Sequence, residues 1–193
     1  MLTPLLALLL AACAGDSPAT TATTEPPLCA TGDDGAANGV LLIAQSVPTS
    51  SRVPCLGAAV PLGWRFSHLD ARNGTARFAL DSDRDGPGAI EVPLESSCDT
   101  GGATEIPSDR EGMRRLERVV QVSPRYVGQR HYDFDGGCLT FSFRLDGDSP
   151  GEALALASQV VGTVSRDDLR AQVRAESGGR LSLDPAEDRG DGP

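Results

Sequence analysis

Lysine is absent from this sequence of 193 residues, so all 17 basic residues are arginine. This absence excludes two motifs that require lysine: the phosphate-binding loop that ends in Gly-Lys-Ser/Thr, and the Ser-x-x-Lys motif of acyl-enzymes. No two cysteines have the Cys-x-x-Cys spacing of a zinc knuckle or a thioredoxin-like site. None of these motifs therefore assigns the protein to a class of enzyme.

Aromatic residues are also scarce, at 4%, whereas hydrophobic residues as a whole reach 39%. A folded core must then consist mainly of Val, Leu, Ile and Ala, and the length suits one modest domain with tails. The net charge of −10 argues against nucleic acid and against anionic lipid surfaces as partners. It is compatible with a cationic partner, or simply with solubility.

The chain begins with an apolar segment, MLTPLLALLLAAC, that ends in a cysteine after small residues. The segment is shorter than the ~20 residues that span a bilayer as a helix, and it has the character of a signal-peptide core. We therefore predict a signal peptide at residues 1–12. No second apolar segment is long enough to span a membrane.

The four residues LAAC, Leu10 to Cys13, resemble the lipobox of bacterial lipoproteins. This resemblance implies that Cys13 carries the lipid, becomes the mature N-terminus and holds the protein at the outer face of the cell membrane. An ordinary secretory peptide, with Cys13 incidental, would instead give a secreted protein. The rest of the chain is similar to the small exported domains of lipoproteins from high-GC Gram-positive bacteria, a likeness that implies no activity.

Polar composition marks both ends of the mature chain. Residues 13–28 are rich in Thr, Ala and Pro without an apolar period, which predicts a flexible tether. Residues 184–193 are polar as well, and we expect a disordered tail. Residues 29–183 between them are predicted to form a single domain.

Four cysteines remain after the lipobox: Cys29, Cys55, Cys98 and Cys138. An even number in an exported chain predicts two disulfide bonds. We favour the pairs Cys29–Cys55 and Cys98–Cys138, although the sequence leaves the two other pairings open. Each bond would stabilise the fold by roughly 2–4 kcal/mol.

A hairpin is indicated by the Asn-Gly turn at residues 73–74, which lies between two alternating segments. Its register places Leu69 opposite Phe78 on one face of the sheet. Phe66 falls on the other face unless a bulge near residues 67–68, or a second packed layer, corrects the alternation.

Further segments complete the predicted fold. A second hairpin is expected around residues 135–137, and the apolar residues 39–47 predict another strand. Two segments with helical spacing follow, at 150–164 and at 166–177, the second with Ser165 as its N-cap. Residues 180–185 would form a closing strand. Strands first and helices last predict an α+β fold, an antiparallel β-sheet built of hairpins with two C-terminal helices on one face.

An acidic loop is the candidate metal site. Asp81, Asp83 and Asp85 lie at every second position and a glycine follows, as at the start of an EF-hand loop. The twelfth position is not acidic and no flanking helices are expected, so the EF-hand pattern is incomplete. A different loop geometry would bind calcium with these three residues and Glu91. The alternative is a polar turn between strands, and no other cofactor is expected.

Two other groups of polar residues could carry chemistry. His131 and Asp133 lie two residues apart on one strand face, where they would form a catalytic pair or two ligands of a metal ion. His68 has no evident partner in the sequence. Four arginines in residues 110–118 form a basic cluster, which would either meet an anionic envelope polymer or simply be solvated.

These observations favour a non-catalytic, lipid-anchored surface protein, an envelope-associated interaction module whose protein or polymer partner the sequence does not identify. One alternative is a calcium-dependent binding module that uses the acidic loop. The other is a small exported hydrolase that uses His131 and Asp133 with an unidentified nucleophile.

Overall fold

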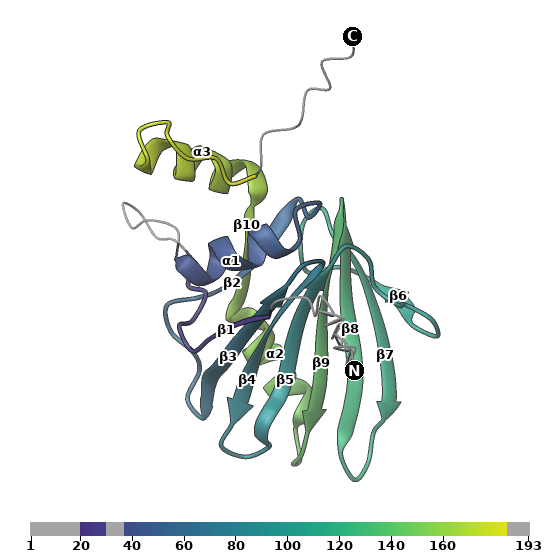
Figure 1. Cartoon of the computed structure of the whole chain (residues 1–193). Helices are drawn as coiled ribbons and strands as arrows, with labels where there is room; N and C mark the ends of the chain where they lie inside the picture. Colours follow the sequence, from purple (N-terminus) through teal and green to yellow (C-terminus); the bar gives the residue numbers. More distant parts are fainter. Residues whose placement is uncertain (1–19, 30–36, 185–193) are drawn as a thin grey trace, which may run out of the picture.

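The structure is a computed structural model and describes residues 20–29 and 37–184. In this part of the chain an antiparallel sheet carries helices on one face (Figure 1). The main sheet contains β1 (Thr21–Thr23), β3 (Trp64–Arg72), β4 (Thr75–Ser82), β5 (Gly86–Glu95), β6 (Thr104–Ile106), β7 (Arg114–Gln121), β8 (Tyr126–Phe134) and β9 (Gly137–Leu145). The other elements are α1 (Asn38–Ser46), β2 (Arg52–Leu56), α2 (Pro150–Gln159), β10 (Val161–Ser165) and α3 (Arg166–Glu176).

The strand order of the main sheet is β1-β3-β4-β5-β9-β8-β7-β6, and all neighbours are antiparallel. Two runs of hairpins, β3-β4-β5 and β6-β7-β8-β9, meet where β5 pairs with β9. Between the two runs the chain leaves β5 at the centre of the sheet and enters β6 at its edge. The predicted antiparallel sheet built of hairpins is confirmed.

The register of the first hairpin follows its turn. Leu69 lies opposite Phe78, as predicted, and the pairing shifts between Phe66 and Leu69. This bulge returns Phe66 to the face of Leu69, opposite Leu80. The predicted bulge near residues 67–68 is therefore confirmed, and it restores the alternation of the two sheet faces along β3.

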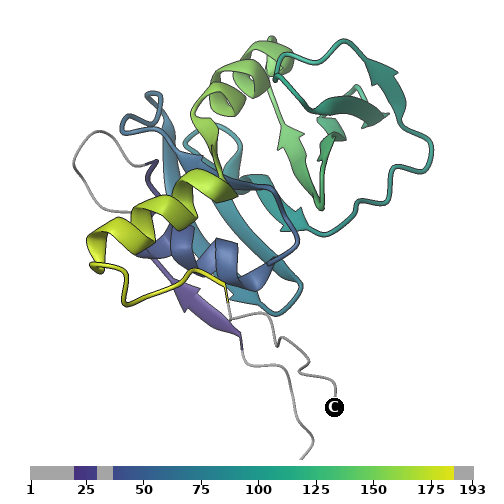
Figure 2. The same ribbon diagram turned by 90° about the horizontal axis from the view of Figure 1, so that it is seen from above.

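The two faces of the sheet differ in what covers them. The core face carries the buried aliphatic and aromatic side chains, among them Leu69, Phe78, Ile90, Leu139 and Phe141. α1 packs against β3 and β4, α2 packs against β9, and the small ribbon of β2 and β10 lies between them. α3 lies above α1 (Figures 1 and 2). We call the opposite side of the sheet the open face.

Three segments differ from their predicted secondary structure. Residues 39–47, predicted as a strand, form α1, which buries Val40, Ile43 and Ala44 at helical spacing. The predicted helix over 150–164 ends at Gln159, because the next residues pair with β2 as β10. The predicted closing strand at 180–185 does not form within the described residues, which end at 184.

The domain is longer than predicted at both ends. Thr21–Thr23, placed by the sequence in the tether, form β1 and pair with the edge strand β3. Leu28 bridges to Leu56, so this part of the predicted tether contacts the fold. Asp184, placed in the tail, binds Arg166. The signal peptide, Cys13, residues 13–19 and residues 185–193 lie outside the described residues.

Both favoured disulfide bonds are present. Cys29 and Cys55 are joined at the start of the domain, and Cys98 and Cys138 are joined across the sheet. Cys98 belongs to the segment that leaves β5 for the edge of the sheet, and Cys138 lies at the start of β9. The second bond therefore fixes this crossing segment to a central strand.

α3 begins as its sequence predicts, with the Ser165 hydroxyl accepting a hydrogen bond from the Asp168 N–H at 3.0 Å. Its first residue, Arg166, is only 3% exposed. The Arg166 guanidinium donates to the carbonyls of Ala44, Val47 and Ser50 at 2.6–2.7 Å. It also pairs with Asp184 at 2.6 Å. One buried side chain thus caps the C-terminal end of α1 and ties it to α3.

A second polar group lies on the core face between β7 and β8. Glu117 accepts from Arg130 at 2.9 Å and from Arg115 at 3.1 Å, and all three side chains are largely buried. Burial alone would raise the pKa of Glu117, but the hydrogen bonds and charges of the two arginines together lower it. The carboxylate is therefore ionised, and its charge offsets part of the positive charge of the two arginines.

Candidate functional site

Three neighbouring hollows lie on the open face of the sheet. The largest has a volume of about 400 Å³ over β3, β4 and β5, and the others measure about 220 Å³ and about 150 Å³ over β5, β9, β8 and β7. Glu91 lines the first and second hollows, and Glu95 lines the first and third. Arg118, Gln129 and Ser142 line the second and third. The hollows thus adjoin, and we call them together the open-face trough.

Two carboxylates that have no partner among the described residues lie in the middle of this trough. Glu91 and Glu95 lie on the same face of β5, four residues and therefore about 13 Å apart along the strand. Within residues 20–29 and 37–184, neither carboxylate forms a hydrogen bond or an ion pair. The residue between them on this face is Pro93, which offers no competing polar group. In the described part of the chain, no other group competes with a ligand for these two carboxylates.

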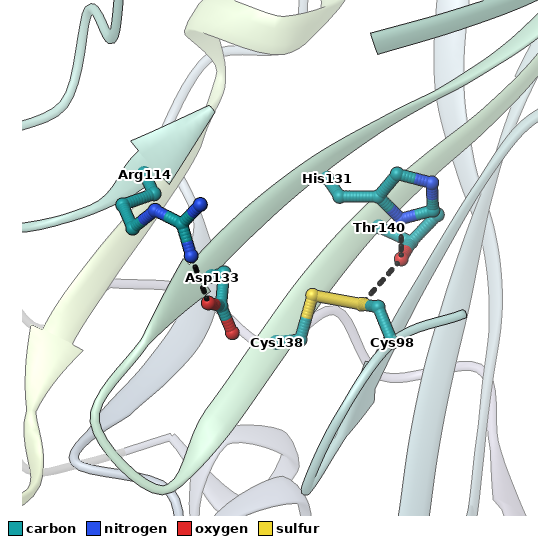
Figure 3. The surroundings of a disulfide bond; sticks show 6 residues. All are labelled: Cys98, Arg114, His131, Asp133, Cys138 and Thr140. Atoms are coloured by element: carbon teal, nitrogen blue, oxygen red, sulfur yellow. Dashed lines mark hydrogen bonds and ion pairs between the residues drawn. A yellow bond between two sulfur atoms is a disulfide. The ribbon is translucent and has the colours of Figure 1, made fainter. Parts of the chain in front are cut away.

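The smallest hollow borders the Cys98–Cys138 disulfide. His131, on β8, lies opposite Thr140 on β9, and its Nδ1 atom is 2.9 Å from the Thr140 hydroxyl (Figure 3). The same hydroxyl lies 3.0 Å from the Cys98 sulfur. A disulfide sulfur has no proton, so the hydroxyl is the donor in this contact and accepts from the imidazole. This direction places the proton of a neutral His131 on Nδ1 and leaves Nε2 as an acceptor.

The four arginines of the basic cluster bind separate partners. Arg110 donates to the carbonyls of Ser158 and Val161, at the end of α2. Arg114 pairs with Glu105 and Asp133, Arg115 pairs with Asp109 and Glu117, and Arg118 donates to Gly101 and Gln129. A continuous basic surface is therefore not formed by these four residues.

The acidic loop lies between β4 and β5, and its carboxylates bind protein donors. Asp81 accepts from the Gly88 N–H at 2.8 Å and pairs with Arg65, which also pairs with Asp83. Asp85 accepts from the Ser82 hydroxyl and from the Asp146 N–H. Glu91 lies on β5 in the trough. The calcium interpretation stays a prediction.

The two histidines are not brought together. His68 lies on β3 beside Asp70, at 3.5 Å, and four strand positions separate β3 from β8. At about 4.8 Å per strand, the distance across the sheet is close to 19 Å. Asp133 pairs with Arg114 rather than with His131. The His131–Asp133 pair of the sequence analysis is therefore replaced by a His131–Thr140 pair.

One serine motif was missed by the sequence analysis. Residues 147–151, Gly-Asp-Ser-Pro-Gly, have the Gly-x-Ser-x-Gly spacing of hydrolase nucleophile turns. Ser149 lies between β9 and α2, in a hollow of about 240 Å³ that neither histidine lines. A serine nucleophile of this class needs a histidine base within hydrogen-bond reach. The hydrolase alternative therefore gains no support from this motif.

Comparison with known protein families, with characterised proteins and with solved structures found no match. In the described part of the chain no helix is long and apolar enough to cross a membrane.

Proposed function

We propose that the protein is a non-catalytic, lipid-anchored binding module of the cell surface, and that its open-face trough binds an extended polar ligand with cationic groups. The observation that supports this function best is the position of Glu91 and Glu95, which have no partner among residues 20–29 and 37–184, where three hollows meet. Carboxylates about 13 Å apart along β5 favour a ligand that extends along this strand and carries more than one cationic group.

The charge of the chain and the expected anchor support the same class of ligand. A net charge of −10 attracts cationic molecules over distances of about one Debye length, ~8 Å at physiological salt. A lipid on Cys13 would hold the trough close to the cell wall. Wall peptidoglycan is an extended polar polymer whose stem peptides carry free amino groups, and it is the ligand we would test first.

We expect the double variant Glu91→Gln/Glu95→Gln to bind purified peptidoglycan about tenfold more weakly than the wild type, a loss of about 1.4 kcal/mol. Glutamine keeps the size of each side chain but removes the charge that an ammonium group would bind. Co-sedimentation of the mature domain with insoluble peptidoglycan measures the effect. The matched control is Glu152→Gln/Glu176→Gln, which removes the same charge from α2 and α3. Equal binding by both variants would contradict the proposal.

The lipid anchor has its own test, since it does not depend on the ligand. We expect the wild-type precursor, expressed in a bacterium that processes lipoproteins, to enter the detergent phase of a Triton X-114 extract and to incorporate labelled palmitate. Cys13→Ser removes the sulfur to which the lipid is attached, so the variant should move to the aqueous phase without label. If the wild-type protein stayed in the aqueous phase, the lipid anchor would be contradicted and the protein would be a secreted binding module.

A further inference from the structure

The Cys98–Cys138 disulfide lies beside an imidazole, and together these side chains contain the ligands of a metal site. The two sulfurs and a ring nitrogen of His131 all lie within 4.8 Å of one another. In the described part of the chain, no other group of three or more His, Cys, Asp or Glu side chains converges in this way. Thiolate and neutral imidazole are the ligands that Zn²⁺ commonly takes from proteins.

His131 is buried beside the disulfide and has few hydrogen-bond partners among the described residues. The side chain is 2% exposed, and its Nε2 atom has no hydrogen-bond partner in the part of the chain that the structure describes. Within residues 20–29 and 37–184, the Nδ1 atom contacts only the Thr140 hydroxyl, so the ring can take a metal ion in place of this weak partner once the two sulfurs separate.

The two sulfurs differ in their access to solvent. Cys138 is fully buried, whereas Cys98 is partly exposed and lines the hollow of about 150 Å³. An external thiolate can approach only the Cys98 sulfur, so Cys138 is the leaving group when the bond is reduced. Cys98 also lies in the connection between β5 and β6, outside any strand, so the sulfurs can separate without breaking the sheet.

We propose that reduction of this disulfide creates a binding site for one zinc ion, with the thiolates of Cys98 and Cys138 and the imidazole of His131 as ligands and water in the fourth position. The reductant is a dithiol, which gives two electrons and two protons to the disulfide and becomes a disulfide itself. Zinc then displaces the two thiol protons. In the oxidised protein the sulfurs are bonded to each other and carry no charge, so the site is closed.

This inference does not depend on the proposed ligand of the trough, and the second disulfide supplies an internal control. Cys29 and Cys55 do not belong to a group of three metal ligands among the described residues. Reduction of the whole protein thus gives two pairs of thiols, of which only one has an imidazole beside it.

Zinc affinity of the mature domain before and after reduction tests the proposal. A phosphine is used as the reductant, since it becomes the phosphine oxide and leaves no competing thiol, and a chromophoric chelator reports the free zinc. We expect no zinc on the oxidised wild type, and one zinc per chain with two protons released on the reduced wild type. Reduced His131→Gln should bind at least about tenfold more weakly, and reduced Cys98→Ser/Cys138→Ser should have no tight site.

Two results would overturn the proposal: reduced wild type that binds no zinc, or equal zinc affinity in the wild type and His131→Gln. The second result covers a reduced chain that has unfolded, because such a chain binds through cysteine without a positioned imidazole. Cobalt(II), which takes the same ligands as zinc and absorbs visible light, gives an independent measurement. Its tetrahedral spectrum should appear with the reduced wild type and change when His131 is replaced.

Discussion

Replacing Gly136 by alanine should lower the free energy of unfolding by about 4 kcal/mol, of which about 1 kcal/mol is left-handed backbone strain and about 3 kcal/mol is overpacking. Gly136 turns the β8–β9 hairpin with a φ of +66°. A Cβ atom there would lie 1.9 Å from the carbonyl oxygen of Thr49, so the hairpin or residues 47–51 must move. The Thr49 hydroxyl also donates to the Gly136 carbonyl at 2.8 Å, and this bond would be lost with the displacement.

Gly74 is the matched control, because it also occupies a hairpin turn with positive φ, +88°, but has nothing within 4 Å of an added Cβ. Gly74→Ala should therefore show the backbone strain alone, about 1 kcal/mol. Urea unfolding of the two variants measures both values. Equal losses would mean that residues 47–51 yield to the added methyl group, and would contradict the tight packing of the second hairpin.

The second large effect is expected at Arg166. Arg166→Met keeps most of the volume and apolar stem of the side chain, but leaves the carbonyls of Ala44, Val47 and Ser50 without their donor and Asp184 without one of its two arginines. Breaking a buried charged network of this kind costs roughly 3–5 kcal/mol. Chemical denaturation measures the loss, and hydrogen exchange should show that α1 opens first.

Arg170→Met provides the comparison, since Arg170 binds the same Asp184 from a half-exposed position. Exposed ion pairs contribute roughly 0–1 kcal/mol, so this variant should remain close to the wild type. If the two variants were destabilised equally, the pairing with Asp184 would account for the effect, and the caps on α1 would contribute little.

Local turn and capping chemistry could be predicted from the sequence because each signal lies within a few residues. The Asn-Gly turn gave the register of β3 and β4, and Ser165 marked the start of α3. α1 was predicted wrongly as a strand because Leu41 and Leu42 fill the gaps between its buried residues. The continuous apolar segment that results does not distinguish a helix from a buried strand.

The trough could not be predicted because it depends on pairing between distant strands. Glu91 lies opposite Ser142 only because β5 pairs with β9, and no local pattern specifies that pair. Thr140 and Ser142 line the smallest hollow together with Glu95, and nothing in the local sequence connects them with that residue. His131 and Thr140 are closer to a local signal, since the β8–β9 turn places them opposite each other.

The seam between β5 and β9 has a consequence for how the sheet assembles. Each run of hairpins contains mainly local pairings, which form quickly, whereas the seam joins residues about fifty positions apart, as in the pair of Ile90 with Phe143. The two runs should therefore form first as separate meanders, in which β5 and β9 are unpaired edge strands. The Cys98–Cys138 bond lies at the end of this seam, where Glu95 faces Cys138. In the oxidised chain it joins the two exposed edges and leaves less opportunity for either one to pair with another molecule.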